Sequence, residues 1–348
     1  MNVTLILGNG FDLNMGLPTA YSDFYKYYML VDSPKSTNLI KQGIGEKPQT
    51  WADLEKSLGE ISKQYGQDSD AYIEAFENVR DELAKYLSAV DEYEILGMEK
   101  ISVHFLRDIL DVDRFLDNKP KQEYREFLKG LNSKDDVELT VVNFNYTTTI
   151  EKLMNVKNEY AMPPKKVTFH EVIHVHQNLD TGILMGVNDV SQISNEAYAK
   201  EFAIRARMVK PFINEMFAAG NDYKCHDAIS DADVVILFGT SFGETDEIWW
   251  ECLKNAVFNR NVRIIYAPYE KEAAKHLHES NVILKNYYFK DTLAKRLSRG
   301  NPMVAQDLYG RIYPIRNNHL FEFGFTRENS DLARTKIISK IMKRTSLS

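Results

Sequence analysis

The first predicted strand of the chain ends in a turn that contains two glycines. Residues 3 to 7 are a short run of aliphatic and β-branched side chains, which is typical of a buried strand. This run passes directly into Gly8-Asn9-Gly10-Phe11-Asp12. Because glycine has no Cβ, the backbone can turn sharply there and approach a bulky group closely. A strand followed by such a turn is the usual opening of a nucleotide-binding α/β domain.

The turn departs from the dinucleotide-binding fingerprint, which has a third glycine three residues after the second. Position 13 is Leu13, and Gly16 comes too late to complete the motif. A turn with two glycines is often only a tight connection between elements. This motif alone therefore leaves ligand binding and simple chain reversal equally open.

Composition narrows the class of protein. A chain of 348 residues with 44% hydrophobic content can bury one sizeable core. A formal net charge of −7 and a pI near 5.7 argue against general nucleic-acid binding. No apolar run approaches the roughly 20 residues that span a bilayer, and no signal-peptide pattern is present, so we expect a cytoplasmic protein without a membrane partner. The two cysteines, Cys225 and Cys252, exclude a disulfide framework and a four-cysteine zinc site.

Hydrophobic periodicity changes along the chain. From residue 71 to 131, apolar side chains recur at three- and four-residue spacing, which predicts helices. Later apolar runs predict buried strands that alternate with helices, including a long helix over 196–217 interrupted near Pro211 and another over 271–278. The predicted later strands are 139–142, 172–176, 234–238 and 262–266. This alternation predicts an α/β fold with a mainly parallel sheet covered on both faces.

The domain organisation follows from these patterns. Residues 1–20 and 133–300 are predicted to form the α/β nucleotide-binding core. A large helical insertion is predicted for residues 21–132. Residues 301–348 are predicted to be a C-terminal extension packed on the core, with a hairpin over 311–323.

Four of the predicted strands end in polar or glycine-rich turns, at residues 8–12, 143–147, 176–178 and 239–246. In a parallel sheet these turns share one edge, where open α/β sheets bind ligands. The four together predict a nucleotide site more strongly than the first turn alone. Ser241 and Thr245 would suit phosphate binding at the start of the next helix, although helix capping is the simpler role for Thr245 and Asp246.

These motifs resemble, in their order along the chain, those of the AbiH family of bacterial abortive-infection (anti-phage) proteins. The resemblance extends to about residue 268 and implies a role in anti-phage defence. The matching segments are Gly8-Asn9-Gly10-Phe11-Asp12 with Leu17-Pro18-Thr19 and Tyr21, Trp51-Ala52-Asp53-Leu54-Glu55, Asn143-Phe144-Asn145-Tyr146-Thr147, His174-Val175-His176, and Gly239-Thr240-Ser241-Phe242 with Asp246.

The AbiH pattern is in turn similar to the sirtuin-like, Rossmann-type fold of defence enzymes that consume NAD. This similarity implies that NAD is the substrate and is cleaved at the nicotinamide–ribose bond. It implies that Asn145 contacts the nicotinamide ribose, that His176 is the catalytic base and that Tyr266 lies near the adenine. The expected ligand-contacting residues are Gly8, Asn9, Gly10, Phe11, Asp12, Tyr146, Gly239, Thr240, Ser241 and Tyr266.

This chain departs from the sirtuin-like pattern at two points. Gln177 stands where a glycine is expected after the histidine. The four-cysteine zinc module of deacetylating sirtuins cannot form from two cysteines, which argues against protein deacetylation.

The residue types suit the implied chemistry. Breaking the nicotinamide–ribose bond passes through a cationic, oxocarbenium-like sugar and needs a base that works near neutral pH, a role that His176 suits. The amide of Asn145 can both donate and accept hydrogen bonds when it positions the ribose. A carboxylate at Asp12 would stabilise the developing positive charge.

Each assignment has a simpler structural alternative. Asn145 also suits a backbone hydrogen bond in a turn, and His176 suits an ordinary buried position. His174 and His176 lie on one face of a strand at metal-ligand spacing, with third ligands available at His170, Asp180 or Asp189. That set falls short of a usual metal site, so no metal is expected.

Two other functions remain open at this point. A non-catalytic sensor of NAD or ADP-ribose, regulating a partner or an oligomer, is favoured by Gln177. A nuclease would need a metal cluster or a basic groove, and the sequence has neither pattern. The partners compatible with these interpretations are a nucleotide ligand, a further copy of the chain and a phage-derived trigger.

Overall fold

The computed structural model describes residues 1–46, 51–95, 97–131, 136–154, 159–162, 165–217, 221–243, 246–269, 279–315, 320–323 and 327–345. Within these ranges, seven strands form one sheet in the order β3-β4-β2-β1-β5-β6-β7. The strands are β1 (Asn2–Leu7), β2 (Val137–Asn143), β3 (Glu159–Met162), β4 (Lys165–His174), β5 (Val234–Phe238), β6 (Arg263–Ala267) and β7 (Ile312–Pro314).

The sheet has the Rossmann-type strand order. The described strands all pair in parallel except β3, which lies antiparallel to β4 at one edge. The parallel strands, counted along the chain, are therefore arranged 3-2-1-4-5-6. In this order the chain changes direction across the sheet between β1 and β5, and ligands bind at the carboxyl ends of that pair in such folds. The predicted mainly parallel α/β sheet is confirmed.

Helices connect the strands and cover the sheet. They are α1 (Gly10–Asn14), α2 (Tyr21–Tyr28), α3 (Asn38–Glu46), α4 (Trp51–Ile61), α5 (Ser69–Asp91), α6 (Met98–Leu110), α7 (Asn118–Gly130), α8 (Thr149–Met154), α9 (Phe202–Met208), α10 (Lys210–Phe217), α11 (Asn221–Ser230), α12 (Glu247–Arg260), α13 (Glu279–Leu297), α14 (Pro302–Tyr309) and α15 (Arg327–Thr345).

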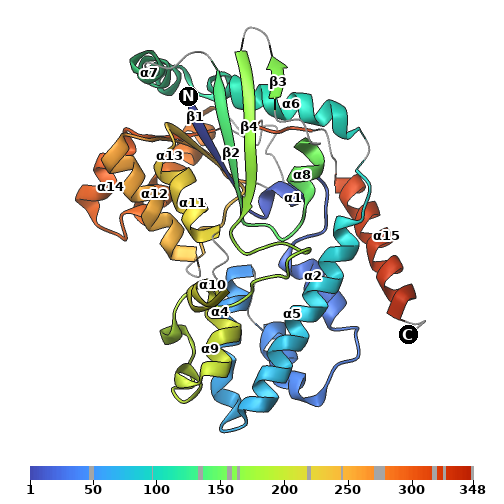
Figure 1. The fold of residues 1–348 in the computed structure, drawn as a ribbon. Coiled ribbons are helices and arrows are strands. Elements are labelled where there is room, and N and C mark those ends of the chain that lie inside the picture. The colour runs from blue at the N-terminus through green and yellow to red at the C-terminus, as the bar shows by residue number, and fades with distance from the viewer. Residues whose placement is uncertain are drawn as a thin grey trace.

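Side chains of the central strand alternate between two cores, as strand geometry requires. Val3, Leu5 and Leu7 of β1 face a core that includes α2, α5, α6 and α8. Ile6 faces the opposite core with α11, α12, α13 and α14. Figure 1 shows these last four helices together on one side of the sheet. The sheet is thus buried on both faces, which explains its near-continuous apolar strands.

The helical segment between β1 and β2 extends beyond the sheet. Helices α2, α4 and α5 lie with α9 and α10 past the end of the sheet where β1 finishes (Figure 1). Residues of this segment can therefore reach the carboxyl ends of the strands. This arrangement places part of the helical segment opposite the polar turns.

Three local expectations differ from the structure or fall outside it. The helix predicted over 196–217 begins later, at Phe202, and its expected interruption near Pro211 falls at Val209, between α9 and α10. Pro211 itself lies in the first turn of α10, where its missing N–H has little cost. Instead of forming a hairpin, β7 pairs in parallel with β6 and so adds the tail to the sheet. The helix expected over 271–278 lies outside the described residues.

Candidate functional site

A cavity of about 440 Å³ lies at the carboxyl ends of β1 and β5, the point at which the strand order reverses. All four polar turns contribute to its wall. So does the helical segment between β1 and β2. The lining residues are Gly8, Asn9, Gly10, Asp12, Leu13, Thr19, Ala20, Tyr21, Glu55, Leu87, Phe144, Asn145, Tyr146, Thr147, His176, Gly239, Thr240, Ser241, Phe242, Asp246, Trp250, Tyr266, Pro268 and Tyr269.

The glycines allow two of these turns to pack against each other. A Cβ at Gly8 would lie 2.5 Å from the carbonyl oxygen of Gly239, and one at Gly10 would lie 2.5 Å from the Cα of Gly239. The N–H of Gly10 donates a hydrogen bond to that same carbonyl at 3.0 Å. Gly239 also has a φ of +65°, which favours glycine. The bulky group that the first turn approaches is therefore the turn after β5.

All but one of the predicted site residues line the cavity. The exception is Phe11, whose ring packs edge-on against Phe238 and Phe321 in the core, with centroids 6.4 and 6.5 Å away. Phe11 follows Gly10 at the start of α1, so its side chain points into the apolar layer under the sheet. It holds α1 against the strands and does not line the cavity.

Asn145 is fixed by hydrogen bonds on three sides. Its Nδ2 donates to the carbonyl of Gly8 at 3.1 Å, and its backbone N–H donates to Oδ1 of Asn143 at 3.0 Å. Its own carbonyl lies 2.9 Å from Nδ1 of His174. These contacts join the turn after β2 to the first glycine turn and hold the amide at the cavity wall.

Asp12 is a buried carboxyl that has no ion pair among the described residues. Its Oδ2 accepts a hydrogen bond from Thr147 at 2.7 Å. Its Oδ1 is buried and has no hydrogen-bond partner among the described residues. Burial raises the pKa of Asp12 to about 7, against the opposing effect of Thr147 and Thr149. Asp12 therefore titrates in the neutral pH range, well above an exposed aspartate.

A buried charge network lies beside the cavity and contributes Glu55, His176 and Asp246 to its wall. Nε2 of His176 lies 3.0 Å from Oδ1 of Asp246. The ammonium of Lys210 lies 3.1 Å from the same oxygen and 3.0 Å from Oε2 of Glu55. Glu55, in turn, accepts a hydrogen bond from the N–H of Gly186 at 3.2 Å. Segments far apart in sequence thus meet around one ammonium group.

The charges of this network are mutually stabilised. Burial alone would raise the pKa of Asp246, but Lys210 and His176 outweigh it and hold that pKa well below its usual range. Burial also opposes the charge of Lys210, yet Asp246 and Glu55 raise the pKa of its ammonium. Asp246 directly precedes α12, but its side chain makes no capping hydrogen bond there. The capping role expected for Asp246 is therefore wrong, because the carboxylate turns to Lys210 and His176.

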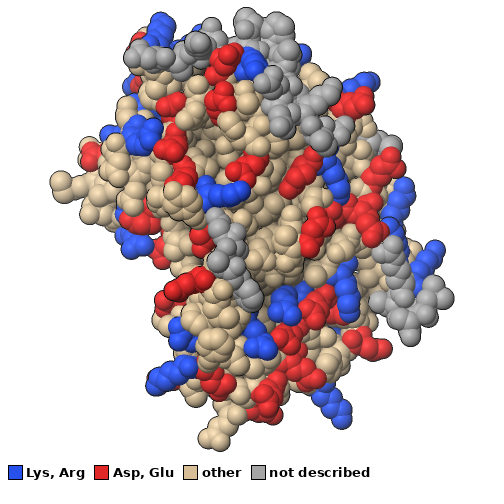
Figure 2. All heavy atoms as spheres, viewed as in Figure 1, with Lys and Arg blue, Asp and Glu red and all other residues tan. Residues whose placement is uncertain are grey.

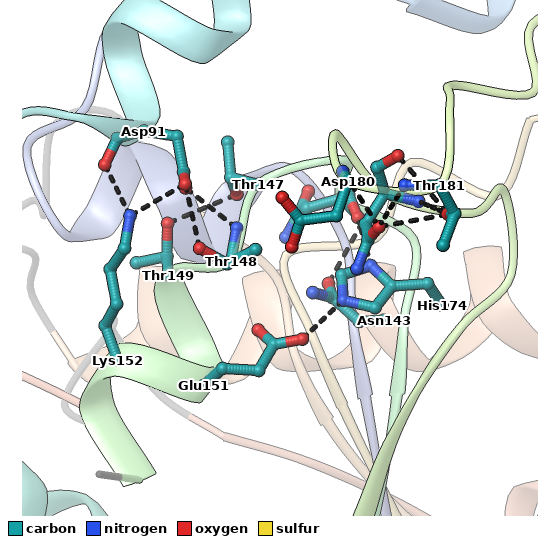
Figure 3. A network of polar contacts seen from close by, with 12 residues as sticks. Asp91, Asn143, Thr147, Thr148, Thr149, Glu151, Lys152, His174, Asp180 and Thr181 are labelled. Carbon is teal, nitrogen blue, oxygen red and sulfur yellow. Dashed lines mark hydrogen bonds and ion pairs between the residues drawn. The ribbon is translucent and has the colours of Figure 1, made fainter.

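His174 belongs to a separate polar network beside the cavity. Its Nε2 lies 2.5 Å from Oε1 of Glu151, and Figure 3 shows the imidazole directed toward this carboxylate. Burial lowers the pKa of His174, but Glu151 outweighs burial and raises it. In the same network, Asp91 of α5 accepts hydrogen bonds from the N–H and Oγ1 of Thr148, both at 2.8 Å (Figure 3). The network ties the helical segment to the turn after β2.

The two histidines do not converge on a metal site. His174 turns to Glu151 and His176 to Asp246. Within the described part of the chain, no group of three or more His, Cys, Asp or Glu side chains is arranged to hold a metal ion.

Aromatic rings line one side of the cavity. Phe144 and Trp250 stack with their centroids 5.4 Å apart and their planes 11° apart. Phe242 contacts Trp250 and Tyr266 edge-on, at 4.8 and 5.4 Å. This aromatic group also contacts His176, because the ring centroids of His176 and Phe144 lie 5.6 Å apart. Flat, largely apolar walls of this kind suit heterocyclic rings.

The backbone at Gln177 is in the left-handed region, with a φ of +60°. Glycine adopts such a conformation without strain. A non-glycine residue in this region has a conformational cost of about 1–2 kcal/mol.

The outer surface is mixed in charge. Figure 2 shows acidic and basic side chains interspersed over the described part of one face. None of the helices in the described ranges is long and apolar enough to cross a membrane.

Neither Lys210 nor Glu55 was among the site residues predicted from the sequence. Glu55 and Asp246 do lie in the segments that resemble AbiH motifs, and this resemblance could have marked them as site residues. Lys210 had no such signal, because a lysine before a proline in a predicted helix is usually solvated. Its side chain is only 5% exposed.

A comparison with protein families places the fold and site in context. The model of the family described as bacteriophage abortive infection AbiH matches residues 4–267, which include most of β1, the helical segment, the polar turns and β6. A comparison with curated proteins found no match. Because the family model covers most of the chain, including every cavity residue before Pro268, this protein belongs to the bacteriophage abortive infection AbiH family.

Proposed function

We propose that this abortive infection protein hydrolyses NAD at the bond between nicotinamide and ribose. The observation that supports this best is the cavity at the reversal of strand order, where Asn145 and the His176–Asp246 pair meet the two glycine turns. Dinucleotides bind at this position in Rossmann-type sheets. The cavity volume of about 440 Å³ lies within the usual range for small-molecule sites.

The sirtuin-like similarity of the motifs is part of this proposal. The left-handed backbone at Gln177 supports it, because a glycine would adopt this conformation without strain. The aromatic wall of Phe144, Trp250 and Tyr266 supplies surfaces for the two heterocycles of NAD.

The reaction needs one base and one positioning group. The C1′–N bond to nicotinamide breaks, water adds to C1′ of the cationic ribose, and the water's proton passes to a base. The products are nicotinamide and ADP-ribose. His176 is the base in this scheme, and Asp246, 3.0 Å from its Nε2, stabilises the imidazolium that forms. Asn145 holds the ribose hydroxyls.

Asp12 has a different part in this scheme. Asp12 lines the cavity, and its Oδ1 has no hydrogen-bond partner among the described residues. In this scheme its carboxylate attracts a cationic group bound in the cavity. Because burial raises its pKa to about 7, a bound nicotinamide cation would favour the ionised carboxylate. Asp12 then stabilises positive charge on the ligand.

The test is direct measurement of nicotinamide release. Protein purified from phage-infected and uninfected cells is incubated with NAD, and nicotinamide and ADP-ribose are quantified by chromatography. We expect equal amounts of both products, with losses of about 10²-fold or more in Asn145→Ala and His176→Ala. Thermal unfolding checks that both variants are folded. Binding of NAD by the protein from infected cells without any turnover would contradict the enzyme proposal.

A nucleotide sensor is the second candidate, and one observation favours it. Nδ2 of Asn145 and Nε2 of His176 are both already engaged within the protein, by Gly8 and Asp246. A site whose polar groups are satisfied in this way can bind without performing chemistry. Calorimetry that detects tight binding of NAD or ADP-ribose, with the nucleotide recovered intact, would support this role.

A further inference from the structure

Four charged or titratable side chains next to the cavity form a connected unit. Glu55 comes from α4, Lys210 from α10, Asp246 from the start of α12, and His176 from the turn after β4. Lys210 is the link, since its ammonium lies 3.0 Å from Glu55 and 3.1 Å from Asp246. His176 joins at the far end of this unit, through Asp246 at 3.0 Å.

Charge balance in this unit depends on His176. With a neutral imidazole, the two carboxylates and one ammonium have a net charge of −1. When His176 takes up a proton, the net charge becomes zero. Unbalanced charge is costly in such a buried site. Through Asp246, the ammonium of Lys210 opposes a second positive charge on the imidazole, and the carboxylate of Glu55 favours one.

We propose that Lys210 and Glu55 are positioning residues that set, through Asp246, how readily His176 accepts a proton. This inference rests on the proposed function, in which His176 is the base. It adds two residues that do not react themselves, one of them from the helical segment between β1 and β2. That segment thereby controls the chemistry of the cavity through a single salt bridge.

Two other groups face His176 from neighbouring elements. Asp222 of α11 is held by Nδ2 of Asn214 at 2.8 and 2.9 Å, and it has an electrostatic interaction with His176. Tyr146 lies beside the imidazole, with 6.2 Å between ring centroids, and its hydroxyl donates to the carbonyl of Leu184. Both remain unchanged in the variants below, so their effects cancel in the comparison.

The experiment compares Lys210→Met, Glu55→Gln and the double variant with the wild type. Lys210→Met leaves the carboxylates of Asp246 and Glu55 without the ammonium between them, so the acidic limb of the pH–rate profile for nicotinamide release should move up by about one pH unit or more. Glu55→Gln removes one negative charge, so the limb should move down. The double variant keeps the original net charge of −1, and its limb should return toward that of the wild type.

Controls separate this role from a purely structural one. Lys340→Met breaks an exposed ion pair with Glu92 and should leave the limb in place. Thermal unfolding reports whether each variant is folded. If Lys210→Met does not fold, Glu55→Gln and the double variant still test the direction of the shift. Unchanged limbs, or shifts of Lys210→Met and Glu55→Gln in the same direction, would overturn the proposal.

A second readout does not depend on turnover. The imidazole signals of His176, identified by their loss in His176→Gln, are followed by NMR over the same pH range. The midpoint should move up in Lys210→Met and down in Glu55→Gln. If no protein releases nicotinamide, the proposed function fails, while these titrations still decide the coupling of Lys210 and Glu55 to His176.

Discussion

Two carboxyl groups of the same cavity, Asp12 and Asp246, have opposite electrostatic surroundings. Asp12 is hydrogen-bonded to a hydroxyl, one of its oxygens has no partner among the described residues, and burial raises its pKa to about 7. Asp246 is also desolvated, but Lys210 and His176 lower its pKa well below the usual range. Where titratable groups of one site are pushed apart in this way, they generally have different proton roles.

The difference assigns a role to each wall of the cavity. The Asp246 wall is internally paired and keeps a fixed negative charge next to His176. Asp12 has an oxygen with no hydrogen-bond partner in the described part of the chain, and burial raises its pKa to about 7. Under the proposed function, the nicotinamide cation would share the cavity with this titratable carboxyl and with a carboxylate already paired with His176 and Lys210.

The largest expected effect comes from removing the fixed charge. Asp246→Asn keeps the shape of the side chain but deprives the imidazolium of its counter-ion, so nicotinamide release should fall by about 10²- to 10⁴-fold. Initial rates at saturating NAD measure this loss. Asp222→Asn is the matched control, because Asp222 lies near His176 but is bonded to Asn214. If the rate of nicotinamide release by Asp246→Asn were within threefold of the wild-type rate, Asp246 would not have the role that distinguishes it from Asp12.

The second prediction concerns the contribution of the buried Lys210 salt bridges to the stability of the protein. Lys210→Met leaves Glu55 and Asp246 as buried carboxylates without the ammonium between them, which should lower the free energy of unfolding by about 3–5 kcal/mol. Urea denaturation followed by circular dichroism provides the measurement. Arg260→Met, which breaks an exposed pair with Asp231, should cost less than about 1 kcal/mol. Equal losses in the two variants would show that the buried network is not held by Lys210.

The third prediction concerns pH on the wall that contains Asp12. The pKa of Asp12 is 3.8 in the unfolded chain and about 7 in the folded protein, so the folded state binds the extra proton between these values. The contribution of this proton to stability is complete below pH 3.8 and is lost as the pH rises through 7. The loss amounts to up to about 4 kcal/mol.

Asp12→Asn tests this directly, because the amide does not titrate. The variant and the wild type should have similar stability at low pH, and the variant should be the more stable at mildly alkaline pH. Unfolding curves at a series of pH values give the difference. Asp111→Asn, at an exposed position, should leave the pH dependence unchanged. A flat difference between Asp12→Asn and the wild type would mean that Asp12 is ionised in the folded protein, like Asp246.

Sequence patterns predicted the paired strands and the gathering of polar turns because both depend on local signals. Aliphatic runs identify buried strands, and parallel strands necessarily bring their carboxyl-end turns to one edge. Asn145, His176 and Asp12 could therefore be assigned to one cavity from the sequence alone. The same reasoning could not separate Phe11 from its neighbours, because a five-residue helix after a turn gives no periodicity from which to orient a side chain.

The charge network was beyond sequence reasoning for a different reason. Lys210 meets Glu55 and Asp246 across separations of 155 and 36 residues. Nothing in its neighbours marks a lysine as buried, since burial results from how α4 and α10 pack beyond the sheet. The two carboxyls Asp12 and Asp246 are likewise indistinguishable by residue type. Their opposite behaviour depends on whether a cation lies within reach.

The smallest expected effect concerns Gln177, the residue next to His176. Its left-handed backbone should cost about 1–2 kcal/mol relative to glycine, while glycine loses about 0.4–1 kcal/mol through the entropy of the unfolded chain. Gln177→Gly should therefore stabilise the protein by up to about 1.5 kcal/mol, as measured by urea denaturation. Gln177→Ala separates the contributions, because alanine removes the side chain but keeps the strained backbone. If the glycine of the sirtuin-like pattern serves only the backbone, nicotinamide release should be the same in both variants and the wild type. A higher rate in both would instead show that the glutamine side chain restrains His176. Gln177 would then belong, with Lys210 and Glu55, to the residues that act on His176 without reacting.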